Sequence, residues 1–311
     1  MSQTFGKKSD LKQRIKNSRF GPFLVSSFET LYTIYRYRVA SLMPEKFFVK
    51  RMFRKKLGYE LDLENPKTFN GKIQWLKLNE REPLQVLCTD KYAVRDYIRE
   101  KIGEAYLIPL LYHTDDPADI TPETLPNVPH IIKANHNSGG AIVVRDKSKL
   151  DYKEVQKSLK VQLGRNYYNF SREWQYKDIE PRIIVEKLLL DEQGKVPKDY
   201  KFHCLNGELA FIQVDLDRYS DHRRNLYDPD WNFIDCQLLY EKGGHAARPP
   251  ELEQMKALAE TIAQDFRLVR VDFYNVGERV YFGELTFYPG NGFEPFTPRV
   301  WDRTFGDRLT L

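Results

Sequence analysis

Two carboxylates near the carboxyl end of the chain stand at a spacing that could hold a metal ion. Residues 268–276 alternate apolar and polar side chains, and residues 279–287 are again extended after a Gly-containing turn, which predicts a β-hairpin. Asp272 and Glu284 would then lie on adjacent strands, ahead of a loop with Gly290. Two hard oxygen ligands beside a glycine-rich loop suit a site for Mg²⁺ and a nucleotide. The alternative is a surface hairpin whose acids are solvated.

A second candidate site is a lysine that precedes a short glycine-rich loop. Residues 130–144 read as strand, loop and strand, with Lys133 at the end of the first strand and Ser138, Gly139 and Gly140 in the loop. Backbone N–H groups of such a loop could bind phosphate oxygens. The loop lacks the GxxxxGK[ST] order of a Walker A motif, so a plain hairpin turn is the alternative.

Two further charged positions need partners. Glu186 interrupts the apolar stretch 182–190, and a carboxylate in a buried strand is costly unless it is paired. The stretch 217–225 concentrates arginines, among them Arg218 and Arg224. Clustered arginines suit an anion, whereas the plainer interpretation is a solvated loop.

The other elements that must position these residues follow from periodicity and turn signals. Thr68 is placed to cap a helix, and Asn206-Gly207 is typical of a tight hairpin turn. The expected elements are helices over 69–78, 90–102, 152–168 and 251–266 and strands over 107–112, 200–204 and 209–214.

Charge is distributed unevenly along the chain. Residues 1–56 hold 14 Lys or Arg against 3 Asp or Glu, a net charge of +11, while the other residues carry 35 against 41, or −6. Leu24, Phe28, Leu31 and Tyr35 form an apolar helical stripe in this basic segment. The segment could contact an anionic membrane surface peripherally, or its helix could pack on the protein's own core. No nucleic-acid-binding pattern occurs, so nucleic acid is not an expected partner.

Composition excludes several classes of protein. A hydrophobic content of 41% excludes wholesale disorder. Three cysteines without CxxC spacing favour a reducing cytoplasm over a disulfide framework. We expect a cytoplasmic protein, peripheral at the inner face of the membrane if residues 1–56 bind it. Six histidines without HxxxH spacing, and no GxSxG or GxGxxG motif, argue against zinc hydrolases, serine hydrolases and dinucleotide-binding enzymes.

Six stretches of the chain, in order, resemble the TupA-like branch of the ATP-grasp enzymes. They are NPKTFNGKIQWLKL, DKYAVRDYI, HNSGG, DYKFHCLNG, VRVDFYNV and GELTFYPGNGFE. The resemblance extends from about residue 45 to the C-terminus. This branch is associated with teichuronopeptide and capsular or other surface-polysaccharide biosynthesis. It implies an α+β ATP-grasp fold in which two α+β lobes clamp ATP, here with a basic helical N-terminal extension.

The resemblance also implies domain boundaries and roles for residues. The expected parts are an extension over 1–57, a first lobe over 58–128, a small ATP-grasp lobe over 129–190 and a C-terminal lobe over 191–311. ATP would be bound by Lys91, Lys133, Ser138, Gly139, Gly140, Glu186, Leu188 and Asp199. Mg²⁺ would be held by Asp272, Glu284 and Thr286. Charge on the reacting groups would be stabilised by Lys201, Arg224, Arg270 and the backbone N–H of Gly290.

One position departs from the family pattern at the metal. The usual sequence is Glu, any residue, Asn, whereas this chain has Glu284, Leu285, Thr286. A hydroxyl is a weaker Mg²⁺ ligand than an amide carbonyl, so a second metal position is in doubt.

The implied activity is an ATP-dependent ligation of a carboxylate to an amine through an acyl phosphate. The expected partners are a carboxylated sugar or acidic glycan acceptor and a small amine, an amino acid or amino alcohol. A sugar kinase with the same fold, and a non-catalytic module that binds nucleotide or polyanion, are the alternatives. No protein nucleophile is needed for either ligation step.

Overall fold

The computed structural model describes residues 43–216 and 221–311. The chain divides into two compact units, residues 1–48 and 49–311, and the site lies within the second. The stripe expected from Leu24 to Tyr35 and the cluster residue Arg218 fall outside the described residues. No helix among the described residues is long and apolar enough to cross a membrane.

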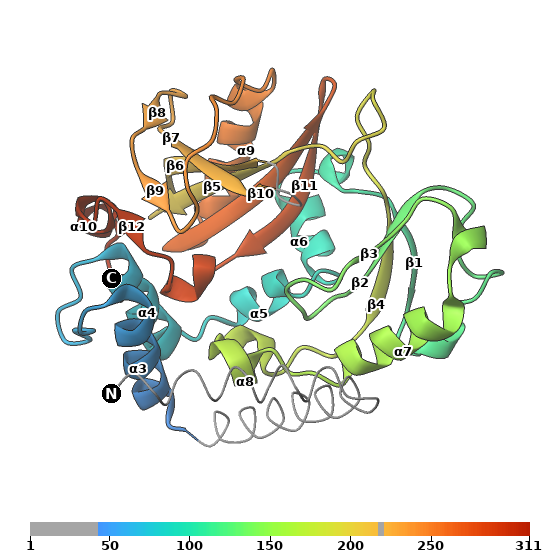
Figure 1. Cartoon of the computed structure of the whole chain (residues 1–311), viewed down its shortest axis with the longest axis horizontal. Helices are drawn as coiled ribbons and strands as arrows, with labels where there is room; N and C mark the ends of the chain where they lie inside the picture. Colours follow the sequence, from blue (N-terminus) through green and yellow to red (C-terminus); the bar gives the residue numbers. More distant parts are fainter. Residues whose placement is uncertain (1–42, 217–220) are drawn as a thin grey trace, which may run out of the picture. The chain divides into compact units, whose positions relative to one another are not determined.

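A six-stranded antiparallel sheet forms the larger framework (Figure 1). Its strand order is β11-β10-β5-β6-β7-β8. The strands are β5 (Asp199–Leu205), β6 (Glu208–Leu216), β7 (Arg223–Tyr227), β8 (Phe233–Ile234), β10 (Leu268–Val276) and β11 (Arg279–Thr286). Helix α9 (Leu252–Ala263) packs on β5, β6 and β10. The predicted hairpins β5–β6 and β10–β11 are therefore both confirmed.

A four-stranded antiparallel sheet forms the second framework, in the order β1-β4-β2-β3. Its strands are β1 (Leu110–Thr114), β2 (His130–Ala134), β3 (Ile142–Val144) and β4 (Ile183–Lys187). Helix α7 (Tyr152–Leu163) packs on β2, and together they enclose a small apolar core. The sequence predicted this helix to continue to Tyr168, but it ends at Leu163, just before Gly164, and a short helix α8 (Tyr168–Ser171) follows.

The remaining helices surround the sheets. Thr68 caps α4 (Phe69–Asn79) as predicted, since its hydroxyl oxygen accepts a hydrogen bond from the N–H of Gly71 at 3.1 Å. Helix α6 begins at Val94 instead of Asp90 and ends at Lys101. The others are α3 (Glu45–Leu57), α5 (Pro83–Thr89) and α10 (Val300–Arg308), with short β9 (Gln237–Leu238) paired to β12 (Phe296–Thr297). Short 3-10 turns are η1 (Glu104–Tyr106), η2 (Pro117–Asp119), η3 (Lys147–Lys149), η4 (Trp174–Tyr176) and η5 (Pro289–Gly292).

The core lies mainly between the larger sheet and the helices around it. Val269, Val271 and Phe273 on β10 are fully buried, as the alternation in the sequence predicted. Their burial turns Arg270 and Asp272 to the opposite face, where the candidate site lies. Apolar packing on one face of β10 thus sets which residues can do chemistry on the other.

Candidate active site

The two predicted metal-binding carboxylates lie directly opposite each other. In the β10–β11 ladder, Asp272 is paired with Glu284 and Arg270 with Thr286. Side chains on directly opposed residues of an antiparallel pair share one face of the sheet. The hairpin therefore gathers four of the predicted site residues on a single face.

Arg270 joins the two carboxylates. Its Nε and Nη2 donate to Asp272 Oδ1 and Oδ2 at 2.7 and 2.8 Å, and Nη2 also donates to Glu284 Oε1 at 3.0 Å. Burial alone would raise the pKa of Glu284, but Lys91 and Arg270 lower it to about 2. The carboxylate of Glu284 is therefore ionised at neutral pH and able to bind a cation.

Lys201 lies on the neighbouring strand β5, opposite Asp272 in the ladder. Its Nζ contacts the carboxylate of Asp199 and lies 3.3 Å from Asp272 Oδ2 and 4.0 Å from Asp215 Oδ2. A buried ammonium is stable only when it is paired in this way. Lys201 therefore connects Asp199, a predicted ATP contact, with the predicted metal ligand Asp272.

Arg224 is a buried residue of strand β7, and the expectation of a solvated loop is wrong for residues 223–225. Its Nε donates to Asp215 Oδ1 at 2.6 Å and its Nη1 to Glu294 Oε2 at 3.0 Å. The guanidinium also stacks over the ring of Tyr240 at 4.9 Å. Arg224 is held rigidly beside the other charged residues of the sheet.

The Gly290 loop is held tightly by its neighbours. Gly290 and Asn291 both adopt left-handed backbone conformations, with φ of 55° and 56°. Gln74 Nε2 donates to the carbonyl of Asn291 at 2.8 Å, and Lys77 Nζ donates to it at 3.3 Å. Helix α4 thus stabilises a backbone conformation that is unfavourable for Asn291 by itself.

On the smaller sheet, Glu186 has the partner that the sequence required. Its Oε2 lies 2.7 Å from Lys133 Nζ, and its Oε1 accepts from Arg95 Nη1 at 3.2 Å. The contacts of Glu186 and Leu188 with ATP stay predictions. The backbone N–H of Leu188, just after β4, bonds to the carbonyl of Pro129 at 3.0 Å.

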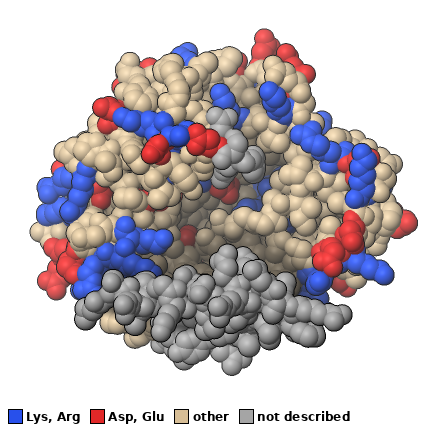
Figure 2. Space-filling view, viewed as in Figure 1, with Lys and Arg blue, Asp and Glu red and all other residues tan. Residues whose placement is uncertain are grey.

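Lys91 connects the glycine-rich loop of Ser138, Gly139 and Gly140 with the β10–β11 hairpin. Its Nζ donates to the carbonyl of Asn137 at 2.8 Å and lies 3.9 Å from Glu284 Oε2. Burial lowers the pKa of Lys91, and the nearby Glu284 opposes this effect. Next to Asn137, Ser138 leads into Gly139 and Gly140, whose φ values are 86° and 77°. Figure 2 shows a hollow in the face in view, with basic and acidic atoms at its floor.

The donor set fits Mg²⁺ as a partner of nucleotide phosphates. No group of three or more His, Cys, Asp or Glu side chains that could hold a metal occurs within residues 43–216 and 221–311. Asp272 and Glu284 supply two carboxylates on one face, with the hydroxyl-bearing Thr286 beside Glu284. Mg²⁺ is commonly bound by one or two carboxylates, with water and phosphate oxygens as its other ligands. These residues would hold such an ion, and their metal role stays a prediction.

Three charged residues of this region were not anticipated from the sequence. Asp215 and Glu294 pair with Arg224, and Arg95 pairs with Glu186. Asp215 is the last buried residue of the largely apolar strand β6, so the signal that marked Glu186 could also have marked it. Glu294 and Arg95 carry no such signal, since Arg95 lies in a charged helix and Glu294 in a loop rich in Gly and Pro, and neither interrupts an apolar strand.

A family model described as TupA-like ATPgrasp matches residues 71–310. The chain belongs to the TupA-like ATP-grasp family. The match confirms both the resemblance and the predicted α+β ATP-grasp fold, and it includes every predicted site residue. Membership of this family supports ATP-dependent ligation as the broad class of activity. The chain has no match among the curated proteins.

Among solved structures, this TupA-like chain is similar to ATP-grasp ligases at low identity. It is 16% identical to D-alanine–D-alanine ligase from Bacillus anthracis complexed with ATP, covering 65% of this chain and 55% of that one at a TM-score of 0.39. It is 17% identical to the Helicobacter pylori D-alanine–D-alanine ligase, and the match covers 78% of this chain and 69% of that one at a TM-score of 0.39. The ATP-grasp ligase PsnB, complexed with minimal precursor, Mg and ADP, is 11% identical, and the match covers 70% of this chain and 56% of that one at a TM-score of 0.38. The chain spans little more than half the length of two of these three structures.

Proposed function

We propose that the protein is an ATP-dependent carboxylate–amine ligase that amidates a uronic acid, or a related carboxylated sugar, during assembly of a capsule or other cell-surface polysaccharide. The observation that carries the proposal is the pairing of Asp272 with Glu284 under the guanidinium of Arg270. Family membership supports ATP as the source of energy.

The charges of the site suit formation of an acyl phosphate. An oxygen of the acceptor carboxylate would attack the γ-phosphorus of ATP, forming one P–O bond while the bond to ADP breaks. Lys133 and Lys91 would bind phosphate oxygens, and Lys201 and Arg270 would stabilise the charge that spreads over the transferring group. Mg²⁺, when held by Asp272 and Glu284, would neutralise further phosphate charge.

Amide formation would follow at the acyl carbon. The amine nitrogen would form the C–N bond and lose a proton, and inorganic phosphate would leave with the C–O bonding pair. Arg270 and the N–H of Gly290 would stabilise the oxyanion that forms between these steps.

The cysteines support a mechanism without a protein nucleophile. Burial raises the pKa of the Cys88 and Cys236 thiols to about 12 and also raises that of Cys204. A thiol at such a pKa is almost entirely protonated at neutral pH and is inert as a nucleophile.

Phosphate release from Mg-ATP tests the proposal. A panel of uronic acids would be combined with a panel of amino acids and amino alcohols, and products would be identified by mass spectrometry. The ligase releases phosphate only when both acceptor and amine are present, and the product gains the mass of the amine less water. Phosphate transfer to a sugar without any amine would instead establish the kinase.

A further inference from the structure

A buried carboxylate, Glu173, lies in the segment 164–182 between α7 and β4, which has no role in the mechanism above. Glu173 is 5% exposed, and its Oε2 accepts a hydrogen bond from Gln175 Nε2 at 3.3 Å. No Lys, Arg or His nitrogen lies within 4.0 Å of this carboxylate in residues 43–216 and 221–311. A buried carboxylate is costly unless it is paired, so Glu173 lacks a positive partner that a ligand could supply.

A second hydrogen-bond acceptor is open beside this carboxylate. Gln175 is 1% exposed, and its buried Oε1 has no hydrogen-bond partner among the described residues. Oε1 belongs to the same amide group as the Nε2 that donates to Glu173, so the open oxygen also lies next to Glu173. A primary ammonium group has a positive charge and three N–H donors. It is therefore the chemical group that would satisfy both acceptors.

The segment is attached to both flanks of Gly290, the proposed oxyanion donor. Asn291 Nδ2 donates to the carbonyl of Ser171 at 3.0 Å, and Trp174 Nε1 donates to the hydroxyl of Tyr288 at 2.8 Å. The buried carboxylate lies between these two anchors in the sequence. It is therefore held beside the loop at which the acyl carbon would react.

Electrostatic interactions also place Glu173 near the reacting groups. Burial is the main cause that raises the pKa of Glu173, and the charges of Lys77 and Arg270 oppose it. Burial likewise raises the pKa of Tyr176, and the charges of Glu173 and Glu284 raise it further. Glu173 is thus close enough to interact with Arg270, and Tyr176 is within range of both carboxylates.

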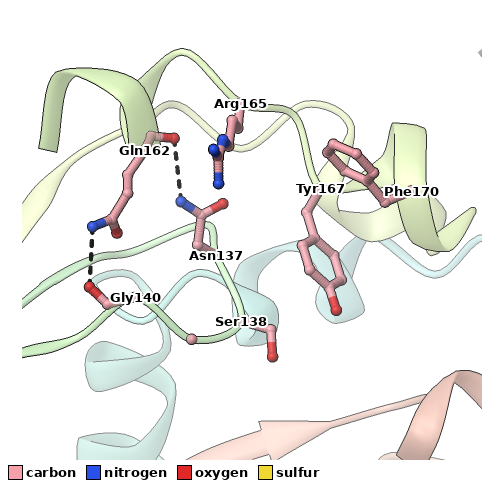
Figure 3. A pocket seen from close by; sticks show the side chains of 8 residues that line it. Asn137, Ser138, Gly140, Gln162, Arg165, Tyr167 and Phe170 are labelled. Carbon is pink, nitrogen blue, oxygen red and sulfur yellow. Dashed lines mark hydrogen bonds between the residues drawn. The ribbon is translucent and has the colours of Figure 1, made fainter. Parts of the chain in front are cut away.

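Tyr167 lies between this carboxylate and the nucleotide loop. Figure 3 shows its side chain at the cavity lined by Ser138 and the loop that follows it, which belongs to the predicted ATP contacts. Burial and then the charge of Glu173 raise the pKa of Tyr167, whereas a hydrogen bond with Ser138 lowers it. The ring of Tyr167 packs against that of Tyr176 with centroids 4.8 Å apart. Glu173 is therefore near the nucleotide site but is not one of its predicted contacts.

Amide formation needs a proton acceptor that the residues assigned above do not provide. Most amines are protonated at neutral pH, and an ammonium nitrogen has no lone pair with which to attack. Lys201 and Arg270 are cations, and Lys91 and Arg270 lower the pKa of Glu284 to about 2. A general base works best when its pKa is near the operating pH, and burial raises the pKa of Glu173 to about 7.

We propose that Glu173 and Gln175 form the binding site of the amine substrate, whose ammonium group donates hydrogen bonds to the carboxylate of Glu173 and to Gln175 Oε1, and that Glu173 then accepts a proton from it. The inference rests on the function proposed above, in which an amine attacks an acyl phosphate. Loss of this proton frees the nitrogen lone pair, which forms the C–N bond. The second proton leaves with the phosphate, as hydrogen phosphate, when the C–O bond breaks.

Hydroxylamine separates this step from formation of the acyl phosphate. It converts an acyl phosphate into a hydroxamate, and because it is a weak base it is largely unprotonated at neutral pH and needs no proton acceptor before it attacks. The test supplies Mg-ATP and the panel of uronic acids, and it measures amide with the panel of amines and hydroxamate with hydroxylamine. Glu173→Gln should lower amide formation by about 100-fold or more, because general-base catalysis contributes roughly 10²–10⁴-fold. It should lower hydroxamate formation by less than about threefold, since the acyl phosphate still forms.

Glu180→Gln is the matched control, because it removes an exposed acid of the same segment. It should match wild type in both reactions, and a selective loss of amide in this variant as well would overturn the role of Glu173. Equal losses of amide and hydroxamate in Glu173→Gln, or no loss of amide, would also overturn the inference.

Wild type separates the two proposals. Hydroxamate without an amide from any amine of the panel would defeat only the amine site. No hydroxamate from any uronic acid would count against the acyl phosphate and would therefore defeat the proposed function itself.

Discussion

Asp272 and Glu284 face each other across β10 and β11, and the guanidinium of Arg270 donates hydrogen bonds to both carboxylates. The two acids alone would repel each other on a single sheet face. Arg270 offsets this repulsion, and together with Lys91 it lowers the pKa of Glu284. The two carboxylates therefore already lie on one face of the sheet, where a divalent cation could bind both of them.

Asp272→Asn should fold but lose the stabilisation that Mg-ATP gives to wild type. A ligand that binds only the native state adds about 2.7 kcal/mol when its concentration is about a hundredfold above Kd. The amide keeps the shape of the side chain and removes the charge that would hold the cation. The measurement is the unfolding midpoint with and without Mg-ATP. Asp230→Asn, an exposed acid with the same charge change, is the control, and equal shifts in both variants would refute the metal role of Asp272.

Lys133→Ala should weaken ATP binding at least tenfold. The variant removes the ammonium that lies 2.7 Å from Glu186, and it leaves Glu186 paired with Arg95 alone. One lost charge-assisted contact to a phosphate corresponds to roughly 1.5–3 kcal/mol. Calorimetry with a non-hydrolysable ATP analogue measures the change. Lys153→Ala, on the exposed side of α7, should bind as wild type does, and an identical Kd for both variants would contradict the assignment.

Gly290→Ala should impair ligation far more than Gly277→Ala. Both glycines have a left-handed backbone, with φ of 55° and 57°. A Cβ at 290 would lie 2.3 Å from Glu294 Cγ, whereas a Cβ at 277 meets no atom within 4 Å. The two variants share the backbone cost of about 1 kcal/mol, but only the first displaces the partner of Arg224. The rate of phosphate release in the presence of acceptor and amine is the readout, and similar losses of rate in both variants would show that the contact with Glu294 has no role.

Glu173→Gln should be more stable than wild type above pH 7. Burial is the main cause that raises the pKa of Glu173 to about 7, and nearby Lys77 and Arg270 oppose it. Tyr167 and Tyr176 also lie close enough to interact with its charge. The pKa of this carboxyl is higher in the folded state than in the unfolded state. Its contribution to stability is therefore fully present at a pH below the unfolded-state pKa, and it is lost as the pH rises through the folded-state pKa.

Wild type should therefore lose stability between about pH 4.5 and 7 through Glu173, by on the order of 1–3 kcal/mol. Glu173→Gln should lack this component. Denaturant unfolding at several pH values in that window measures it. If the difference in free energy of unfolding between wild type and Glu173→Gln does not change with pH, Glu173 has an ordinary pKa.

Local pattern was sufficient for the hairpin that carries the metal-site residues. Alternation over β10 placed Arg270 and Asp272 on the face opposite Val271, because successive side chains of a strand point to opposite sides. The register set by the turn pairs Phe273 with Phe282, and a β-bulge between Asp272 and Phe273 then shifts the pairing by one residue and brings Glu284 opposite Asp272. The sequence by itself determined the hairpin and the face of Asp272, whereas the structure decided the bulge that places Glu284.

Partners distant in sequence were decided only by the tertiary structure. The sequence left an anion contact and a solvated loop open for the arginine cluster. Pairing of β7 with β6 places Arg224 against Asp215, and the chain after β11 brings Glu294 to it. In the same way β1, from the predicted first lobe, joins β4 in the smaller sheet. Periodicity shows which face of an element is apolar but not which element covers or pairs with it. That choice depends on packing and charge pairing summed over the whole folded unit.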